Sequence, residues 1–285
     1  MKVLVLGVTG MLGNTLFRYF SADSNYQVWG TLRSPSGCKH FSNDTHSRLI
    51  SHIDVLDSDD LVSVMEQVRP DVVINCVGLI KQLADAKDPL TALPINAMFP
   101  HRLAKFCALA NARLVHISTD CVFSGRKGMY AEQDVSDAED LYGKSKFIGE
   151  LHDSSHAVTL RTSIIGHELQ SSESLIDWFL SQKESTKGYE KAIFSGLPTI
   201  ELARVIKEYI IPKPELSGLY HVSVEPIDKL SLLKLVAEVY HKEIQIIPDD
   251  QVCIDRSLDS SRFQQATGYT PPSWPELVKS MHASR

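Results

Sequence analysis

The chain has 285 residues, of which 43% are hydrophobic and 22% charged, and its net charge at pH 7 is -6. This balance is typical of a folded globular protein and excludes an intrinsically disordered chain. Because proteins that bind a phosphate backbone are usually basic, the net charge argues against a nucleic-acid partner. The length fits one large domain or two modest ones.

The five cysteines are scattered and form no C-x-x-C pair, so neither a disulfide framework nor a zinc knuckle is expected. The apolar run Val3–Leu6 ends at Gly7 after four residues, which is too short for a signal peptide. No stretch approaches the roughly 20 apolar residues that a membrane span requires. We therefore expect a cytoplasmic protein with no membrane partner.

Short apolar runs alternate with amphipathic segments over the first 163 residues. The expected elements are strand 3–6, helix 11–20, strands 27–32 and 49–53, helix 61–68, strand 72–76, helix 95–110, strand 114–118, helix 141–151 and strand 157–161. Strands that alternate with helices form βαβ units, whose right-handed crossovers place helices on both faces of a parallel sheet. The sequence thus predicts an α/β fold in which residues 1–163 form a Rossmann-type, doubly wound NAD(P)-binding domain.

Beyond residue 163 the alternation becomes looser. The sequence predicts helices at 175–182 and 201–211, strand 219–222, helix 230–240, strand 244–247, and short helices at 257–267 and 274–281. We expect residues 164–285 to form mainly a smaller C-terminal α/β lobe that binds substrate, with some segments returning to the Rossmann domain.

A glycine motif of the form G-x-x-G-x-x-G joins the first expected strand to the first helix. Gly7 permits a tight turn, Gly10 lets backbone amides approach a pyrophosphate, and Gly13 permits close contact between helix and sheet. The helix N-terminus adds hydrogen-bond donors and a favourable dipole. Because the motif stands between strand and helix, it predicts a dinucleotide site formed by Gly7, Thr9, Gly10, Met11, Leu12 and Gly13.

The end of the second expected strand bears on which dinucleotide is bound. NAD-binding proteins usually carry an acid there, which holds the ribose hydroxyls. This strand instead ends in Leu32-Arg33-Ser34, and an arginine can pair with a 2′-phosphate. NADPH is therefore the expected cofactor, with NADH as the alternative. The alternative for Arg33 is a solvated surface residue, and Asp54-Val55 is either a contact to the adenine or an ordinary loop.

Tyr142 and Lys146 form a Y-x-x-x-K motif on an expected helix. Residues i and i+4 share one helix face, so the phenol and the ammonium should point into one site. A nearby cation lowers the pKa of a phenol, which is ordinarily about 10. Tyr142 could then pass a proton to a carbonyl oxygen as hydride arrives, while Lys146 could also bind the nicotinamide ribose. A pair on the surface of a helix is the alternative interpretation.

Neighbouring strand ends support the catalytic interpretation. Thr119 follows the fifth expected strand, 23 residues before Tyr142, and its hydroxyl could bind the substrate carbonyl. The fourth strand is followed by Cys76-Val77-Gly78, where the small Gly78 leaves room for cofactor. Asn96 opens the next long helix, where it is either a cofactor contact or a helix cap.

Together these residues resemble the extended short-chain dehydrogenase/reductase superfamily and, within it, the dTDP-4-dehydrorhamnose reductase-like group of sugar-nucleotide reductases. The resemblance covers nearly the whole chain. Its more specific motifs are Ser118–Gly125, Tyr142–Lys146 with Gly149-Glu150, Leu160–Ser163, Gly196–Thr199 and Ser257–Phe263.

The resemblance implies that Thr119, Tyr142 and Lys146 are the catalytic triad of an NAD(P)H-dependent oxidoreductase. It implies hydride transfer to C4 of a nucleotide-linked 4-keto-6-deoxyhexose, in precursor synthesis for a surface polysaccharide. Substrate contacts are expected at Asp120, Cys121, Val122, Ile164 and Arg256. Because Cys121 replaces a common Tyr and Ile164 a common Trp, the sugar is left open. Some relatives hold magnesium at a dimer contact; we identify no matching ligands and predict no metal, and a homodimer stays open.

Three other functions belong to the same superfamily or branch. A 4,6-dehydratase would carry Glu after Asp120 to assist elimination, and Cys121 disfavours it. A 4-epimerase uses the same triad with tightly held NAD, against which Arg33 argues. The third alternative is a regulatory subunit that binds NADP without turnover. It would be free to lose Thr119, Tyr142 and Lys146, yet all three are present.

Overall fold

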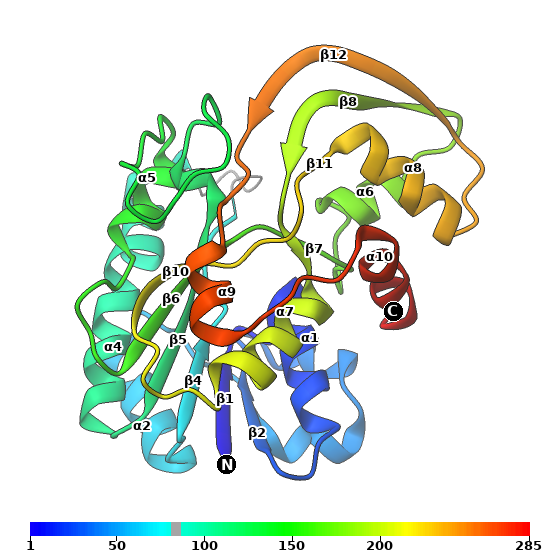
Figure 1. Cartoon of the computed structure of the whole chain (residues 1–285). Coiled ribbons are helices and arrows are strands. Elements are labelled where there is room, and N and C mark those ends of the chain that lie inside the picture. The colour runs from blue at the N-terminus through cyan, green and yellow to red at the C-terminus, as the bar shows by residue number, and fades with distance from the viewer. Residues whose placement is uncertain (81–86) are drawn as a thin grey trace.

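The computed structural model describes residues 1–80 and 87–285. Its centre is a seven-stranded parallel sheet in the order β10-β6-β5-β4-β1-β2-β3 (Figure 1). The strands are β1 (Lys2–Leu6), β2 (Gln27–Thr31), β3 (Leu49–Ile50), β4 (Val72–Asn75), β5 (Arg113–Thr119), β6 (Ala157–Thr162) and β10 (Gly218–His221). The strand order reverses between β1 and β4, and such a switch point is where open α/β sheets bind ligands. The predicted Rossmann-type doubly wound fold is confirmed.

Alternate residues of β1 explain why helices cover both faces of this sheet. Val3 and Val5 enter one core, whereas Leu4 and Leu6 enter the other, and all four are fully buried. The first core packs against α1 (Met11–Ser21), α7 (Thr199–Val205) and the continuing π-helix η6 (Ile206–Ile210). The second packs against α2 (Ser58–Val68) and α4 (Phe99–Leu109).

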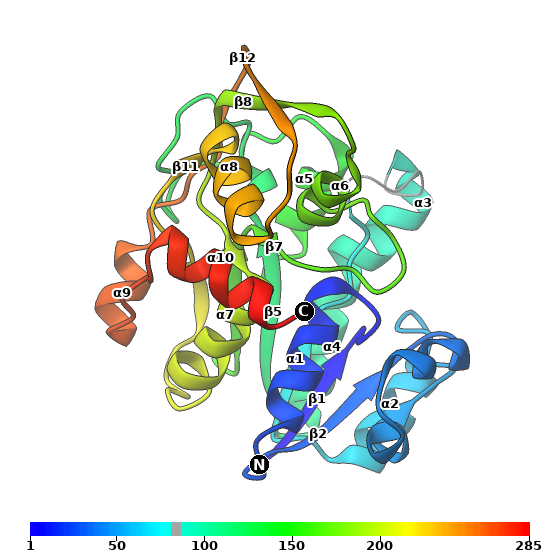
Figure 2. The same cartoon turned by 90° about the vertical axis from the view of Figure 1, so that its right-hand side faces the viewer.

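A smaller lobe follows the sheet, mainly after residue 163. Its three-stranded sheet has the order β11-β8-β12, and β8 and β12 form a long arch above the central sheet (Figures 1 and 2). The elements are β7 (Ile164–Ile165), α6 (Leu175–Ser181), β8 (Ser185–Phe194), β9 (Leu197–Pro198), β11 (Ile227–Asp228), α8 (Lys229–Val239), β12 (Gln245–Asp255), α9 (Ser261–Thr267) and α10 (Trp274–Ala283). Figure 2 shows α8 and α10 between the arch and α7.

Several boundaries differ from the sequence predictions. The strand expected at 49–53 has two residues, and short 3-10 helices η1 (Pro35–His40) and η2 (Asn43–Arg48) precede it. The strand expected at 244–247 continues to residue 255, and the helix expected at 257 begins at Ser261. Strand β8 was not predicted, because only Gly188, Ala192 and Phe194 of its ten residues are buried.

The helix expected to open at Ile95 starts earlier. It begins with α3 (Pro89–Ala92), continues through the π-helix η4 (Leu93–Met98) and runs into α4. Asn96 therefore lies inside a helical segment, and the interpretation of Asn96 as a helix cap is wrong. None of the helices in residues 1–80 and 87–285 has the length and hydrophobicity to cross a bilayer.

Candidate active site

The glycine loop has the geometry that its motif predicts. Gly7 has a φ of 81°, in the left-handed region that favours glycine. A Cβ on Gly13 would stand 2.2 Å from the Gly7 carbonyl oxygen, so α1 can approach the loop only with glycine there. The Gly10 amide donates to the same carbonyl at 3.1 Å. The loop is thus a closed turn beneath the N-terminus of α1.

Gly10 meets a different constraint. A Cβ on this exposed residue would approach only the Gly7 carbonyl, at 3.4 Å, which is an ordinary contact. The protein itself therefore does not require glycine at this position. Gly10 is the N-cap of α1, no side chain caps that end, and its first turn contains no acid. Space and unpaired amides at a helix N-terminus fit a bound pyrophosphate.

The residues expected to bind the adenosine half of the cofactor lie along the edge formed by β2 and the segment after β3. The Ile53 amide donates to the Leu32 carbonyl at 3.3 Å, which brings Arg33 and Asp54 to neighbouring chains. Arg33 is exposed and has no ion pair with any described residue. Asp54 accepts the Leu56 amide at 3.0 Å, which is a local turn. Of the two side chains, Arg33 has the freedom to bind a phosphate.

Lys146 lies where β4, β5 and the helix α5 (Leu141–Ile148) meet. Its buried ammonium donates to the Ile117 carbonyl at 2.7 Å. A Cβ on Gly78 would stand 3.7 Å from Lys146 Nζ and 3.4 Å from Asn96 Oδ1. Gly78 itself is exposed, and a side chain there would contact the Lys146 ammonium; the room for cofactor expected at this position stays a prediction.

Asn96 connects two of the segments that surround Lys146. It is buried, its Oδ1 accepts the Leu79 amide at 2.9 Å, and its Nδ2 donates to the Ser145 hydroxyl at 3.2 Å. Both ends of the amide are therefore occupied by protein. Asn96 fixes the segment after β4 against α5, and its direct contact with the cofactor stays a prediction.

Thr119 and Tyr142 meet in front of the carboxyl end of β5. Thr119 Oγ1 accepts the Cys121 amide at 3.1 Å and caps the short helix η5 (Asp120–Val122). A Cβ on Gly143 would stand 2.2 Å from the Cys121 carbonyl, so glycine lets α5 lie directly against η5. The Tyr142 phenol interacts with the Thr119 side chain. The two hydroxyls that the motifs predict are thus brought together.

The pKa values of the pair differ from the sequence expectation. Burial raises the pKa of Tyr142, and the neighbouring Cys121 adds to that increase, while the contact with Thr119 opposes it. Lys146, which was expected to lower the pKa of Tyr142, is not among the main groups that act on it. Burial lowers the pKa of Lys146 to about 8, although the charge of Glu150 acts in the opposite direction. Near neutral pH, Tyr142 is a neutral acid and Lys146 is mostly charged.

Of the residues expected to bind substrate, some lie near Thr119 and others pack into hydrophobic clusters. Cys121 and Asp120 border Thr119, and the Arg256 guanidinium donates to the Phe123 carbonyl at 2.7 Å. Ile164 is half-buried and lies in β7, against the main core. Val122 is fully buried in a small cluster with aromatic neighbours. The structure does not bring the Val122 side chain to the site.

Sequence reasoning missed Lys229, the first residue of α8. Its side chain is partly buried, which lowers its pKa, and it interacts electrostatically with Asp120, Arg256 and Cys121. Asp120 is buried, which raises its pKa, while Arg256 and Lys229 act against that increase. Two cations of the C-terminal lobe thus face the segment after β5. No local sequence signal distinguishes Lys229 from an ordinary lysine at the start of a helix.

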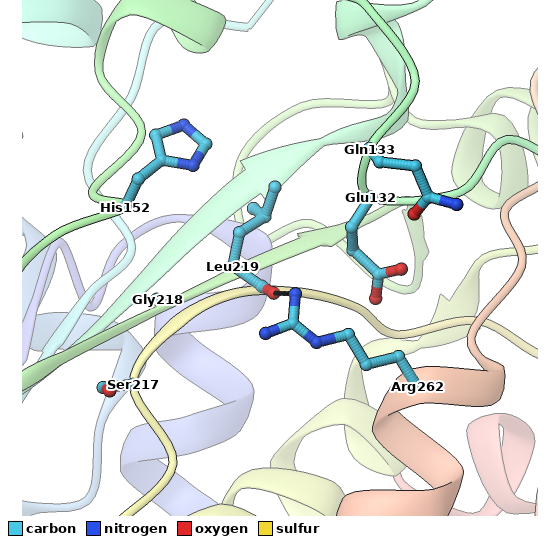
Figure 3. A pocket seen from close by; sticks show the side chains of 7 residues that line it. All are labelled: Glu132, Gln133, His152, Ser217, Gly218, Leu219 and Arg262. Atoms are coloured by element: carbon cyan, nitrogen blue, oxygen red, sulfur yellow. Dashed lines mark hydrogen bonds between the residues drawn. The ribbon is translucent and has the colours of Figure 1, made fainter.

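Two pockets lie away from these residues. One, of about 290 Å³, is on the outer side of β10, where Glu132, His152 and Arg262 surround Leu219 (Figure 3). The other, of about 430 Å³, lies between α1 and the C-terminal residues. Neither contains a predicted site residue. Within residues 1–80 and 87–285, no group of three His, Cys, Asp or Glu side chains could hold a metal ion.

The chain is similar to known proteins over most of its length. The family model described as RmlD substrate binding domain matches residues 1–284. Methionine adenosyltransferase 2 subunit beta from Xenopus tropicalis is 26% identical over 314 residues, covering 97% of this chain and 88% of that protein. A dTDP-4-dehydrorhamnose reductase from Aggregatibacter actinomycetemcomitans is 24% identical over 306 residues, covering 99% and 98%.

Solved structures share the fold. The dTDP-4-dehydrorhamnose reductase of Bacillus anthracis, in complex with NADP, has a TM-score of 0.80 at 22% identity, covering 99% of this chain and 98% of that chain. The enzyme WbmG of Bordetella bronchiseptica, in complex with NAD, has a TM-score of 0.81 at 17% identity, covering 100% and 93%. The resemblance stated from the motifs is confirmed. Because the family match extends over almost every residue, the chain belongs to the RmlD substrate binding domain family.

Proposed function

We propose that the protein is an NADPH-dependent reductase of a nucleotide-diphospho-4-keto-6-deoxyhexose, a cytoplasmic enzyme whose product is a precursor of a surface polysaccharide. The observation that carries the proposal is the interaction of Tyr142 with Thr119 at the end of β5, together with the bond that Lys146, one turn further along α5, makes to the Ile117 carbonyl of the same strand. Gly10, where a side chain would meet only one ordinary contact, follows the carboxyl end of β1 at the same edge of the sheet. NADP in the structure of the Bacillus anthracis relative supports the choice of cofactor.

When bound, NADPH supplies a hydride to the keto carbon of the sugar. Tyr142 donates its phenolic proton to the carbonyl oxygen, which completes the alcohol and leaves a phenolate. Thr119, whose hydroxyl donates to Asp120 Oδ1 at 3.2 Å, turns to donate to the substrate oxygen. Lys146 stabilises the phenolate by its charge and holds the ribose hydroxyls.

The environment of Tyr142 suits the direction of reduction. Burial raises its pKa and so keeps the proton available for the substrate near neutral pH. The same burial would make a bare phenolate costly, which requires the ammonium of Lys146 nearby. Since the pKa of Lys146 is about 8, that charge is present under neutral conditions and is lost in mild alkali.

The test is a panel of dTDP-, UDP- and GDP-linked 4-keto-6-deoxyhexoses, assayed with NADPH and with NADH by the loss of nicotinamide absorbance. We expect turnover of at least one sugar with NADPH, and a loss of kcat of roughly 10²- to 10⁴-fold in Tyr142→Phe. Tyr26→Phe is the matched control, because Tyr26 is half-buried in the Rossmann domain and packs on Phe20. Full turnover by Tyr142→Phe would refute the mechanism.

A regulatory subunit is the second candidate. It is favoured by the 26% identity to methionine adenosyltransferase 2 subunit beta over 97% of this chain. In that case the protein would bind NADPH but oxidise none of it with any sugar in the panel. A 4-epimerase would instead interconvert the 4-hydroxyl sugars without net consumption of reduced cofactor. The panel therefore separates the reductase from the other two functions, and product analysis with a 4-hydroxyl sugar nucleotide separates the epimerase from the regulatory subunit.

A further inference from the structure

A buried ionic network lies directly behind the proposed catalytic residues. The Arg161 guanidinium donates to both carboxylate oxygens of Glu150, from Nε and from one terminal nitrogen, each at 2.7 Å. The Ser118 hydroxyl donates to the same carboxylate at 2.7 Å. At 1–4% exposure, these three side chains are out of contact with bulk water.

The other side of the Arg161 guanidinium also has partners in the protein. Its remaining terminal nitrogen lies 3.3 Å from His221 Nε2, and its guanidinium lies 5.1 Å from the centre of the Phe123 ring. His221 Nδ1 is 3.0 Å from the Tyr130 carbonyl, so that nitrogen carries the hydrogen and Nε2 accepts from Arg161. The network therefore spans β6, β10 and the segment after β5.

The network reaches solvent at His152. His152 Nε2 lies 3.6 Å from Glu150 Oε2, and the His152 side chain is half-exposed in the pocket drawn in Figure 3. Glu132, on the opposite wall of that pocket, accepts the backbone amide of His221 at 2.9 Å. The pocket is thus the outer boundary of the network, and the proposed active site is its inner boundary.

Two bonds tie α5 and the segment that follows it to successive residues of β5. Lys146 donates to the Ile117 carbonyl, and Glu150 accepts the Ser118 hydroxyl. Thr119 is the next residue of the strand. Pairing with β6, through Ser118–Arg161 and Thr119–Thr162, holds the strand end within the sheet. The bond from Ser118 to Glu150 adds a side-chain link between that strand end and the segment that follows α5, and so bears on the position of Thr119 relative to Lys146.

We propose that Glu150 and Arg161 are positioning residues, which fix Thr119 and Lys146 relative to each other without touching substrate or cofactor. This inference rests on the proposed function of the same site. A buried ion pair is a weak source of stability, because desolvation offsets much of its attraction, so a geometric role accounts better for its presence. The bidentate contact to Arg161 fixes the orientation of the Glu150 carboxylate. That carboxylate accepts the Ser118 hydroxyl and favours the charged form of Lys146.

The charge of Glu150 also acts on Lys146. Besides Glu150 on the segment after α5, the groups that interact with Lys146 are Cys76 after β4 and His116 on β5. Glu150 favours the ammonium, whereas burial opposes it. A neutral residue at position 150 should therefore move the loss of the Lys146 proton to lower pH, by roughly 1 unit.

The experiment compares Glu150→Gln with Glu201→Gln. Glu201 is also buried and accepts two bonds from one arginine, Arg204, at 2.7 and 2.9 Å, but it belongs to α7 and not to the site. Both variants should lower the melting temperature. Only Glu150→Gln should lower kcat, by about 100-fold with little change in KM, and move the alkaline limb of kcat to lower pH. Equal melting losses with unchanged kcat and pH profile in both would overturn the proposal.

Ser118→Ala covers the case in which Glu150→Gln does not fold. It removes one bond and leaves the ion pair in place, and we expect about a fivefold loss of kcat with an unchanged alkaline limb. An unchanged kcat would count against positioning. If the wild-type protein oxidises no NADPH, the proposed function fails on its own. The pH dependence of NADPH binding by Glu150→Gln then tests the position of Lys146, and a profile identical to wild type overturns the inference.

Discussion

Acidification from pH 6.5 to 4 should weaken the fold through His221. Burial, with a contribution from Arg161, lowers the pKa of His221 from 6.5 to about 4. The unfolded chain therefore takes up a proton below pH 6.5 that the folded protein refuses until about pH 4. The contribution of neutral His221 to the free energy of unfolding is fully present above pH 6.5 and is lost as the pH falls from 6.5 to about 4. A difference of about 2.5 units corresponds to about 3 kcal/mol of the free energy of unfolding.

The assay is urea denaturation of the wild type and His221→Gln at closely spaced pH values. Glutamine can still accept the Arg161 hydrogen bond but does not titrate, so the gap between the two curves should change by about 3 kcal/mol between pH 6.5 and 4. His116, whose pKa burial also lowers, contributes to both curves and cancels in the gap. His282→Gln, at an exposed position of α10, is the control. Parallel curves for wild type and His221→Gln would refute the reasoning.

The site makes three further predictions. Gly10→Ala should weaken NADPH binding with little change in melting temperature, whereas Gly13→Ala should destabilise the fold, because its Cβ would stand 2.2 Å from a carbonyl oxygen; cofactor titration and thermal melts distinguish them. Arg33→Ala should raise the Kd of NADPH about 10- to 100-fold and leave that of NADH unchanged, as measured by nicotinamide fluorescence. The kcat of the wild type should fall as the pH rises above about 8, where Lys146 loses its proton, and a flat profile up to pH 10 would contradict this role.

The sequence predicts the Rossmann half well because local rules and global packing agree there. The strands at 3–6 and 72–75 are short apolar runs that are buried on both faces. The glycine loop requires close backbone contacts that only its residue types allow. Tyr142 and Lys146 lie on one helix, so their spacing alone predicts that they point together.

The rest depends on contacts between distant segments. Strand β8 is mostly polar and exists because it pairs with β11 and β12, which lie far along the chain. The role of Asn96 arises from its meeting with Leu79 and Ser145, and no cap pattern encodes that. The partners of Glu150 are 11 and 32 residues away, so its motif identifies the residue and leaves its function open.

The charges around Thr119 connect the C-terminal lobe with the proposed chemistry. The single hydroxyl proton of Thr119 is donated to Asp120, and donation to a substrate oxygen must break that bond. Asp120 would then be a buried carboxylate that has lost a hydrogen bond, which is unfavourable unless cations stand nearby. Lys229 and Arg256 supply that charge from α8 and the segment after β12. Because both belong to the smaller lobe, we expect the proposed turn of Thr119 to the substrate to depend on the packing of that lobe against the sheet.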